Sequence, residues 1–459
     1  MMKMCNIVGI TGLVVGSALG ETTSDFANPP MQFRPRPLLH WSDNVTSGPL
    51  LTKVQNMKDK CGYGGMAVID AASSPAYMSS EYLTLYGDML SKASALGMKV
   101  NMYDEYSFPS GRAGGQFEAR FPNDRMQRLE MIAEDVTGPM TYTKTIPSGT
   151  LMGCVAMDNS TKARTDITAN VSGNVLTYTV PAGSYKIMMF TCVIDGYGGV
   201  CDYLAPAAVE KFISLVHQKY YDKWSTYFGN VLDMSFYDEP TMCRVAGGRA
   251  WTPNYNTWFL SENGYSPVAY YPALWYDIGP TTAAARNALF GFRAQLYAKA
   301  FTKTLNDWCD AHHIQLTGHQ DQEELVNPVG SCGDLMKSYK YQAIPGVDNI
   351  FFYSRGATVY KLISSVAYNW DKSLVASEAF GASAPSENTM YMEAMDEYAK
   401  GINFMVPHSA WLNKCQINPR LDEENATYAA ILPNFTKYVG RLNTTSHGSR
   451  SASPIRDSG

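Results

Sequence analysis

The sequence predicts an α/β fold: a (β/α)8 barrel with a small β-rich, sandwich-like insertion after the third strand. Short apolar runs end abruptly in polar or ionisable residues, and a longer helical pattern follows most of them. Eight such runs occur, the number of strands in this kind of barrel. One segment breaks the rhythm with period-2 alternation, which indicates antiparallel strands. A doubly wound open sheet is the alternative that the same alternation allows.

The expected strands share a nearly continuous apolar composition, typical of parallel strands buried on both faces. They are Pro37 to Trp41, Met66 to Asp70, Lys99 to Asp104, Leu232 to Asp238, Gln315 to His319, Asn349 to Tyr353, Leu374 to Glu378 and Ile402 to Pro407. Helical patterns cover Ser80 to Leu96, Pro206 to Phe228, Ala283 to His313, Val359 to Asn369, Thr389 to Lys400, and Glu424 to Leu442 with a break at Pro433.

The β-rich insertion is expected over residues 141–201, where Thr, Val, Gly and Ser dominate. It divides the catalytic barrel into a first part, 21–140, and a remainder, 202–442. The polar, Ser-rich residues 443–459 are expected to be a disordered tail, because they cannot bury a core.

The N-terminus has the features of a secretory signal peptide over residues 1–20. Lys3 precedes an apolar run from Ile7 to Val15, and small residues follow as far as Gly20. This run is too short to span a membrane, and no other stretch is long enough without a charge or Pro. We therefore expect a secreted, extracellular protein that is not bound to a membrane.

Composition excludes a further class of partner. The 459 residues carry a formal net charge of -5, and no basic block interrupts them. A nucleic-acid binder would need a basic face, so nucleic acid is not an expected partner. The oligomeric state is left open.

In an exported protein, cysteines can form disulfides. Eight of the nine lie outside the signal segment, and an even number in an oxidising compartment permits disulfides, with Cys192 and Cys201 a candidate pair. No Cys/His cluster has zinc spacing. Six Asn-x-Ser/Thr sequons would be glycan acceptors in a eukaryotic source.

Glu239 is the sharpest catalytic candidate. It follows Asp238 at the end of an apolar strand, and Pro240 bars continuation of that strand. Two adjacent, partly buried acids raise each other's pKa, which keeps one protonated and ready to act as an acid. A helix N-cap pair or a metal ligand is the alternative interpretation.

Glu378 is the expected partner, because it ends the seventh strand beside the small residues Ala379 and Gly381. The ends of strands four and seven face each other across a barrel mouth, and two carboxylates flanking one bond are what glycoside hydrolysis requires. A structural carboxylate paired with a nearby cation is the alternative.

A third polar cluster follows strand five. His319, Gln320, Asp321, Glu323 and Glu324 could hold sugar hydroxyls or a calcium ion, since oxygen ligands of this density suit a hard cation. A solvated loop is the alternative. Other strand ends supply the remaining candidates for substrate binding: Asp104, Asp238, His408 and Trp411.

Several motifs in this chain resemble secreted glycosidases related to the α-L-rhamnosidases of glycoside hydrolase family 106. They are Arg34-Pro-Arg-Pro37 with Trp41, Gly62-Tyr-Gly-Gly65, Phe236-Tyr-Asp-Glu-Pro240, Gly264-Tyr265, Tyr271-Pro-Ala-Leu274, Thr317-Gly-His319, Pro345-Gly-Val-Asp348 and Ser377-Glu378. The likeness runs from about Arg34 to Leu442.

The resemblance implies a barrel enzyme with an inverting mechanism and a calcium-assisted site that releases terminal rhamnose from plant or microbial polysaccharide. It places the catalytic acids on Glu239, Glu324 and Glu378. Opposed acids on strands four and seven would also suit a retaining enzyme. The alternative class is a catalytically inactive carbohydrate-binding barrel. An esterase is not expected, because the chain lacks a Gly-x-Ser-x-Gly elbow.

Overall fold

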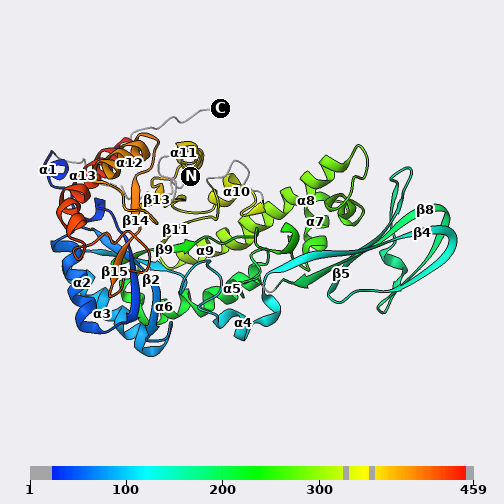
Figure 1. Cartoon of the computed structure of the whole chain (residues 1–459), viewed down its shortest axis with the longest axis horizontal. Coiled ribbons are helices and arrows are strands. Elements are labelled where there is room, and N and C mark those ends of the chain that lie inside the picture. The colour runs from blue at the N-terminus through cyan, green and yellow to red at the C-terminus, as the bar shows by residue number, and fades with distance from the viewer. Residues whose placement is uncertain (1–22, 196, 324–329, 351–356, 451–459) are drawn as a thin grey trace, which may run out of the picture.

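A computed structural model describes residues 23–195, 197–323, 330–350 and 357–450 (Figure 1). The predicted signal peptide, residues 1–20, and Glu324 lie outside the described residues. No helix in the described part is both long enough and apolar enough to cross a membrane.

Nine parallel strands form two sheets. The larger has the order β11-β9-β3-β2-β1-β15 and consists of β1 (Leu38–Asn44), β2 (Gly65–Ser74), β3 (Lys99–Tyr103), β9 (Leu232–Asp238), β11 (Gln315–His319) and β15 (Ala410–Leu412). The smaller has the order β12-β13-β14 and consists of β12 (Gly346–Asn349), β13 (Ala376–Ala379) and β14 (Phe404–Pro407). All paired neighbours in both sheets run parallel, which confirms the α/β class.

The two sheets enclose a shared interior. Ten buried residues form one cluster that draws on both sheets, among them Leu38, Ile69, Phe236, Ala376 and Val406. Single backbone hydrogen bonds bridge the two seams: Ile344 N donates to Leu316 O (3.0 Å), and Arg36 N donates to Met405 O (3.3 Å). Because the strand ladders of the described residues do not run through these seams, a closed barrel is not confirmed.

Helices cover the outer faces of the sheets and fill the connections. They are α1 (Thr23–Ala27), α2 (Ser47–Asp59), α3 (Ser80–Leu96), α4 (Gln116–Arg120), α5 (Pro206–Leu215), α6 (His217–Trp224), α7 (Tyr255–Asn263), α8 (Thr282–Tyr297), α9 (Thr304–Ala311), α10 (Leu335–Tyr339), α11 (Ala357–Asn369), α12 (Glu387–Ala399) and α13 (Ala426–Arg450). Helix α3 has the predicted bounds because Ser79 caps its first turn and Gly97, at a φ of 67°, ends it.

Two boundaries differ from the sequence expectation. Helix α13 continues past Leu442 to Arg450, and Asn443 is buried there, donating to Phe33 O. The strand that corresponds to the sixth predicted one is β12, which begins at Gly346 and ends at Asn349, the residue where the sequence placed its start. The consequence for the site is that Asp348 belongs to a strand.

The β-rich segment is a long antiparallel arm (Figure 1). It consists of β4 (Gln127–Thr145), β5 (Thr150–Asp158), β6 (Arg164–Asp166), β7 (Val171–Ser172), β8 (Val175–Ile194) and β10 (Ala250–Trp251). The strands belong to one sheet of order β10-β4-β8-β5-β6, with β7 beside β8, so the expected sandwich is a single twisted sheet with its own small core. Its first strand begins at Gln127, earlier than residue 141, because β4 and β8 pair without interruption by a turn over almost their whole length.

The expectation of disulfides is wrong for the described residues, among which no disulfide is formed. Cys192 lies on β8 with its thiol 3.5 Å from Gln127 Oε1, whereas Cys201 packs near Gly111 and Tyr203. The suggested pair therefore faces different neighbours. Burial raises the pKa of both thiols above its usual value, so both remain protonated.

Candidate active site

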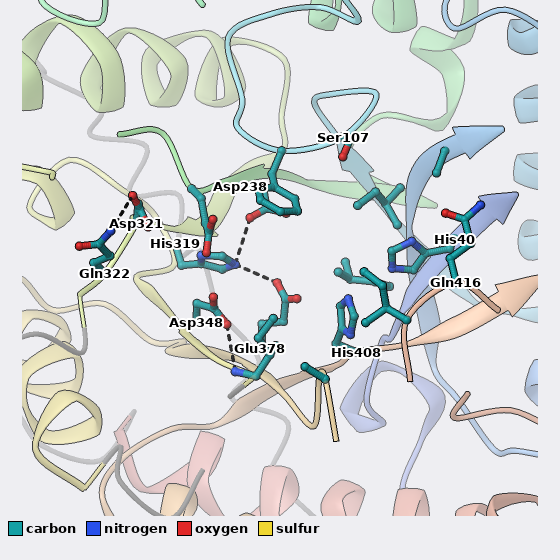
Figure 2. A pocket seen from close by; sticks show the side chains of 18 of the residues that line it. His40, Ser107, Asp238, His319, Asp321, Gln322, Asp348, Glu378, His408 and Gln416 are labelled. Atoms are coloured by element: carbon teal, nitrogen blue, oxygen red, sulfur yellow. Dashed lines mark hydrogen bonds and ion pairs between the residues drawn. The ribbon is translucent and has the colours of Figure 1, made fainter. Parts of the chain in front are cut away.

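A pocket of about 450 Å³ lies at the carboxyl ends of the parallel strands (Figure 2). Its polar lining comes from His40 on β1, Asp238 and Glu239 at the end of β9, His319 at the end of β11, Asp348 on β12, Glu378 on β13, and from Arg244, Asp321, Gln322, His408, Trp411 and Gln416. Most of these residues follow apolar strand segments, so one edge of the fold gathers side chains that are far apart in sequence. The sequence-predicted residues Asp238, Glu239, His319, Glu378, His408 and Trp411 thus meet in one cavity.

The centre of the pocket is a buried cluster of Asp238, His319 and Glu378. His319 Nε2 lies 2.8 Å from Glu378 Oε2 and 3.6 Å from Asp238 Oδ1. Burial alone would lower the pKa of His319, but the hydrogen bond to Glu378 and the negative charges around the ring raise it well above its usual value. His319 is therefore an imidazolium that pairs with the carboxylate of Glu378.

Asp238 and Glu378 differ in their surroundings. Burial raises the pKa of Asp238 to about 7, against the opposing effects of His319 and of the Tyr103 hydroxyl, which donates to Asp238 Oδ2 over 2.5 Å. Burial also raises the pKa of Glu378, and the hydrogen bond from His319 opposes that rise. Ionised Glu378 thus depends on its histidine partner.

Of the two adjacent acids at the end of β9, Asp238 and Glu239, Glu239 holds its proton more firmly. Burial, then the charge of Asp238 and that of Asp348, raise the pKa of Glu239 to about 10. Its φ of 42° lies in the left-handed region that residues with a Cβ rarely adopt. Such strain is found where the surrounding structure imposes it, often at functional sites.

The loop that follows β3 supplies one wall of the pocket. Buried Glu105 accepts hydrogen bonds from the backbone N–H groups of Tyr106, Arg112, Ala113 and Gly114 at 2.6 to 2.9 Å. These bonds fold the chain between them into a tight loop, and Ser107 and Phe108 of that loop reach the pocket. Glu105 is a structural carboxylate beside the site.

Three predicted site residues are not among those that line the pocket. Asp104 is buried and accepts a hydrogen bond from Ser110 Oγ (2.5 Å). Gln320 is buried, and its amide donates to Tyr237 and Ser338. Glu323 accepts a hydrogen bond from Asp348 N at 3.0 Å, which fixes the strand that carries Asp348. All three support neighbours of the pocket from behind.

The family resemblance implies a calcium ion at the site. The described residues that could share one metal are Asp238, His319 and Glu378, which offer an imidazole nitrogen and two carboxylates. Calcium takes six to eight oxygen ligands, and imidazole suits zinc or other transition metals better. The cluster does not fit calcium, and the two described acids after strand five have different partners: Asp321 accepts from Cys243 Sγ, whereas Glu323 accepts from Asp348 N.

Sequence reasoning did not find His40, Arg244, Asp348 or Gln416. Successive strand residues point to opposite faces, so Trp41 packs outward against Tyr82 and Tyr86 while His40 lines the pocket. The sequence shows that side chains alternate along β1 but not which of the two sets points into the pocket. Asp348 was missed because its strand was placed too late.

The chain was compared with known proteins. No protein-family model and no curated protein matches it. Its fold is similar to that of a rhamnosidase from Novosphingobium sp. PP1Y, with a TM-score of 0.72 and 14% sequence identity. The similarity covers 92% of this chain and 60% of that one, so the chain spans less than two thirds of the rhamnosidase's length. A fold comparison also returns the catalytic domain of a beta-amylase from Paenibacillus polymyxa, with a TM-score of 0.47 and 9% identity over 82% of this chain and 93% of that one. At this identity the rhamnosidase establishes a shared fold.

Proposed function

We propose that this protein is a secreted glycoside hydrolase that removes terminal α-L-rhamnoside-like sugars from an oligo- or polysaccharide, and that its two parallel sheets act as one barrel. The observation that carries the proposal is that two acids of the pocket lie in environments that favour opposite protonation states. Glu239 keeps a proton at neutral pH, while Glu378 is paired with the imidazolium of His319. Two carboxyl groups with separated roles are the minimum equipment for glycoside hydrolysis.

In the proposed reaction Glu239 donates its proton to the glycosidic oxygen as the bond to the anomeric carbon breaks. Ionised Glu378 either attacks the anomeric carbon or removes a proton from the attacking water. Water supplies the hydroxyl group on the released sugar. Its proton goes to Glu239 in the retaining case; in the inverting case it goes to Glu378, which releases it to solvent while Glu239 takes one up from solvent. His319 holds Glu378 in its charged form through the 2.8 Å contact.

The separation of the two carboxyl groups distinguishes the stereochemical outcomes: about 5 to 5.5 Å favours retention and about 6.5 to 9.5 Å favours inversion. Glu324, which the family resemblance also places among the catalytic acids, remains an alternative partner for Glu239. A Glu324→Gln variant compared with Glu378→Gln identifies which acid completes the pair.

Hydrolysis of aryl glycosides, beginning with 4-nitrophenyl α-L-rhamnopyranoside, tests the function, and NMR of the first-released anomer gives the stereochemistry. The Glu239→Gln variant should lose most turnover, whereas Glu81→Gln, at an exposed position on α3, should not. Sugar binding without turnover by the wild-type protein would support a carbohydrate-binding barrel instead. Appearance of the processed protein in the medium of an expressing cell tests secretion.

A further inference from the structure

One wall of the pocket is built from two histidines and a tryptophan. The two histidines, His40 and His408, are labelled in Figure 2. His40 comes from β1, His408 follows β14 and Trp411 lies on β15. Their exposed fractions are 5%, 6% and 1%. The His40 ring stacks on Trp411 with centroids 4.0 Å apart and planes at 15°, and it meets the His408 ring edge-on at 5.2 Å. The wall is therefore rigid and closely packed.

Each of these side chains carries a buried ring nitrogen that is unsatisfied within the described part of the chain: His40 Nε2, His408 Nδ1 and Trp411 Nε1. Buried polar groups are nearly always hydrogen-bonded in folded proteins, and leaving one unpaired costs free energy. Because His40 and His408 line the pocket, an occupant placed against this wall can supply the missing partners of their ring nitrogens.

Both imidazoles are neutral. Burial holds the pKa of His40 well below its usual value, and the charge that His408 would carry lowers it further. Burial also lowers the pKa of His408, despite the opposing charges of Asp348 and Asp238. A neutral imidazole has one N–H donor and one acceptor nitrogen. A hydroxyl group matches it because it can both donate and accept.

The remaining charges of the pocket select against an anion. Of the five carboxyl groups that line it, Glu239 keeps its proton and Glu378 is paired with charged His319, which leaves Asp238, Asp321 and Asp348 against the cation Arg244. A carboxylate or phosphate on the ligand could only accept hydrogen bonds and would meet this acidic surface. The ligand class that fits is an uncharged ring bearing hydroxyl groups.

Apolar side chains of the pocket, including Leu38, Ile69, Ile350 and Ile417, offer surfaces for the C–H face of such a ring. Trp411, expected from the sequence to bind substrate, is 1% exposed and has one face covered by the His40 ring, so it offers little free surface to a sugar. The role left for Trp411 is to hold His40.

We propose that His40, together with His408, binds hydroxyl groups of an uncharged terminal sugar, and that Trp411 is a positioning residue that fixes the His40 ring by stacking. This inference rests on the proposed function, because it assumes that the pocket holds a glycoside. It adds residue roles and a charge selectivity for the sugar.

The test combines a substitution in the protein with removal of single hydroxyl groups from the substrate. Kinetics are measured for wild type and His40→Leu with 4-nitrophenyl α-L-rhamnopyranoside and its 2-, 3- and 4-deoxy analogues. His40→Leu should lower kcat/KM about 10- to 100-fold, the loss expected for one hydrogen bond to a buried group. On one analogue the wild type should show a similar loss and the variant little further loss. Losses that multiply independently on every analogue would overturn the assignment.

Trp411 is tested through its partner. Trp411→Leu should reduce kcat/KM to about the His40→Leu value, and the double variant should fall no further, whereas Trp411→Phe keeps a flat ring and should retain most activity. A double variant that is the product of both losses would show that Trp411 does not act through His40. Thermal unfolding of each variant, with exposed His313→Gln as the matched control, separates loss of binding from loss of fold.

Failure of the proposed function can be told apart from failure of this inference. If the wild type cleaves no glycoside, binding of methyl α-L-rhamnopyranoside is measured by calorimetry on wild type and His40→Leu. Binding that weakens at least tenfold in the folded variant supports the histidine wall even though hydrolysis has failed. Equal binding by both proteins, or none by wild type at millimolar sugar, overturns it.

Discussion

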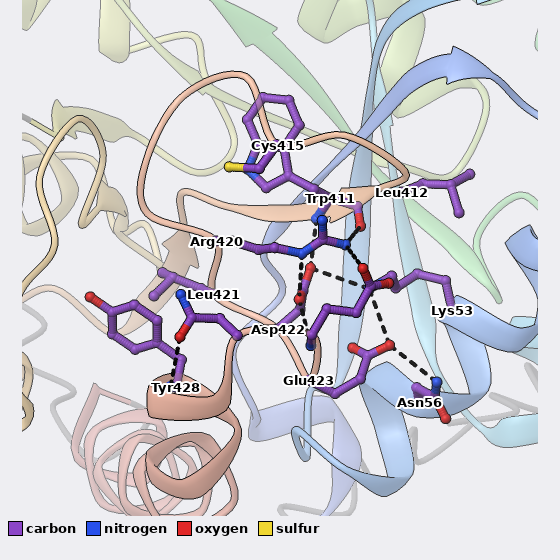
Figure 3. A network of polar contacts seen from close by, with 12 residues as sticks. Lys53, Asn56, Trp411, Leu412, Cys415, Arg420, Leu421, Asp422, Glu423 and Tyr428 are labelled. Carbon is purple, nitrogen blue, oxygen red and sulfur yellow. Dashed lines mark hydrogen bonds and ion pairs between the residues drawn. The ribbon is translucent and has the colours of Figure 1, made fainter.

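Lys53 on α2 joins the first βα unit to the segment that carries part of the pocket wall (Figure 3). Its Nζ lies 3.3 Å from Asp422, 3.1 Å from Glu423 and 2.9 Å from Glu424. Asp422 in turn accepts hydrogen bonds from Trp411 N and from Arg420 Nε, both at 2.9 Å. Replacing Lys53 with Met keeps an unbranched side chain, one heavy atom shorter, and removes the charge.

The expected loss in free energy of unfolding follows from the burial of these charged side chains. The side chains of Lys53 and Asp422 are 2% and 0% exposed, and that of Glu423 is 6% exposed. Removing one partner of a buried ion pair costs about 3–5 kcal/mol, because the other charge stays buried and uncompensated. Arg420 still compensates Asp422, so we expect Lys53→Met to lower the free energy of unfolding by about 2–4 kcal/mol.

Glu424 provides the matched control, because its side chain is 50% exposed and water screens its contact with Lys53. Glu424→Gln should cost less than about 1 kcal/mol. The double variant Lys53→Met/Glu423→Gln should recover part of the loss, since it removes one of the stranded charges.

Urea unfolding followed by circular dichroism gives these free energies, with a shift in midpoint at unchanged slope as the sign of a stability change. Trp411 and Ile417 line the pocket from this segment, so KM should rise in Lys53→Met as well. The reasoning is refuted if Lys53→Met unfolds within about 0.5 kcal/mol of wild type, or if Glu424→Gln costs as much.

Three further predictions concern the acids and thiols. Glu239→Gln should lower kcat by about 10²- to 10⁴-fold while keeping the fold, and wild-type activity should fall on the alkaline side as the pKa of Glu239, about 10, is approached; a variant with normal turnover would remove Glu239 from the reaction. Burial raises the pKa of Glu397 to about 8. The protonated Glu397 carboxyl therefore contributes fully to the free energy of unfolding below about pH 4, and this contribution is lost as pH rises through 8. The loss is at most about 5 kcal/mol. Glu397→Gln should therefore flatten the fall in unfolding free energy between pH 5 and 8, and an unchanged slope in urea titrations at several pH values would contradict this. Alkylation without reductant should label Cys243 and Cys415 first, because they are only half-buried, and all eight described thiols after unfolding; fewer would indicate disulfides.

Strand ends were predictable because local pattern determines them. An apolar run followed by Asp238, Glu239 and Pro240 fixes the end of β9, and Gln315 to His319 reads directly as β11. The sequence thereby indicated three of the central groups, Asp238, His319 and Glu378, without knowledge of their distances.

The site as a whole depended on tertiary structure. Which face of β1 points inward cannot be read from a run that is apolar on both faces, so the sequence does not show that His40 lines the pocket while Trp41 packs outward. The polar residues after β11 look alike in sequence, yet Asp321 lines the pocket while Gln320 and Glu323 support it from behind. Thiol pairing likewise depends on distances between segments, which composition does not contain.

The sequence by itself determined the alternation of strands and helices and the placement of acids at strand ends, because both follow from local periodicity. Only the tertiary structure decided that Glu239 keeps its proton and that Glu378 pairs with charged His319. The physical reason is that a pKa depends on burial and on the charges within a few ångströms, and those neighbours come from strands far apart in the chain.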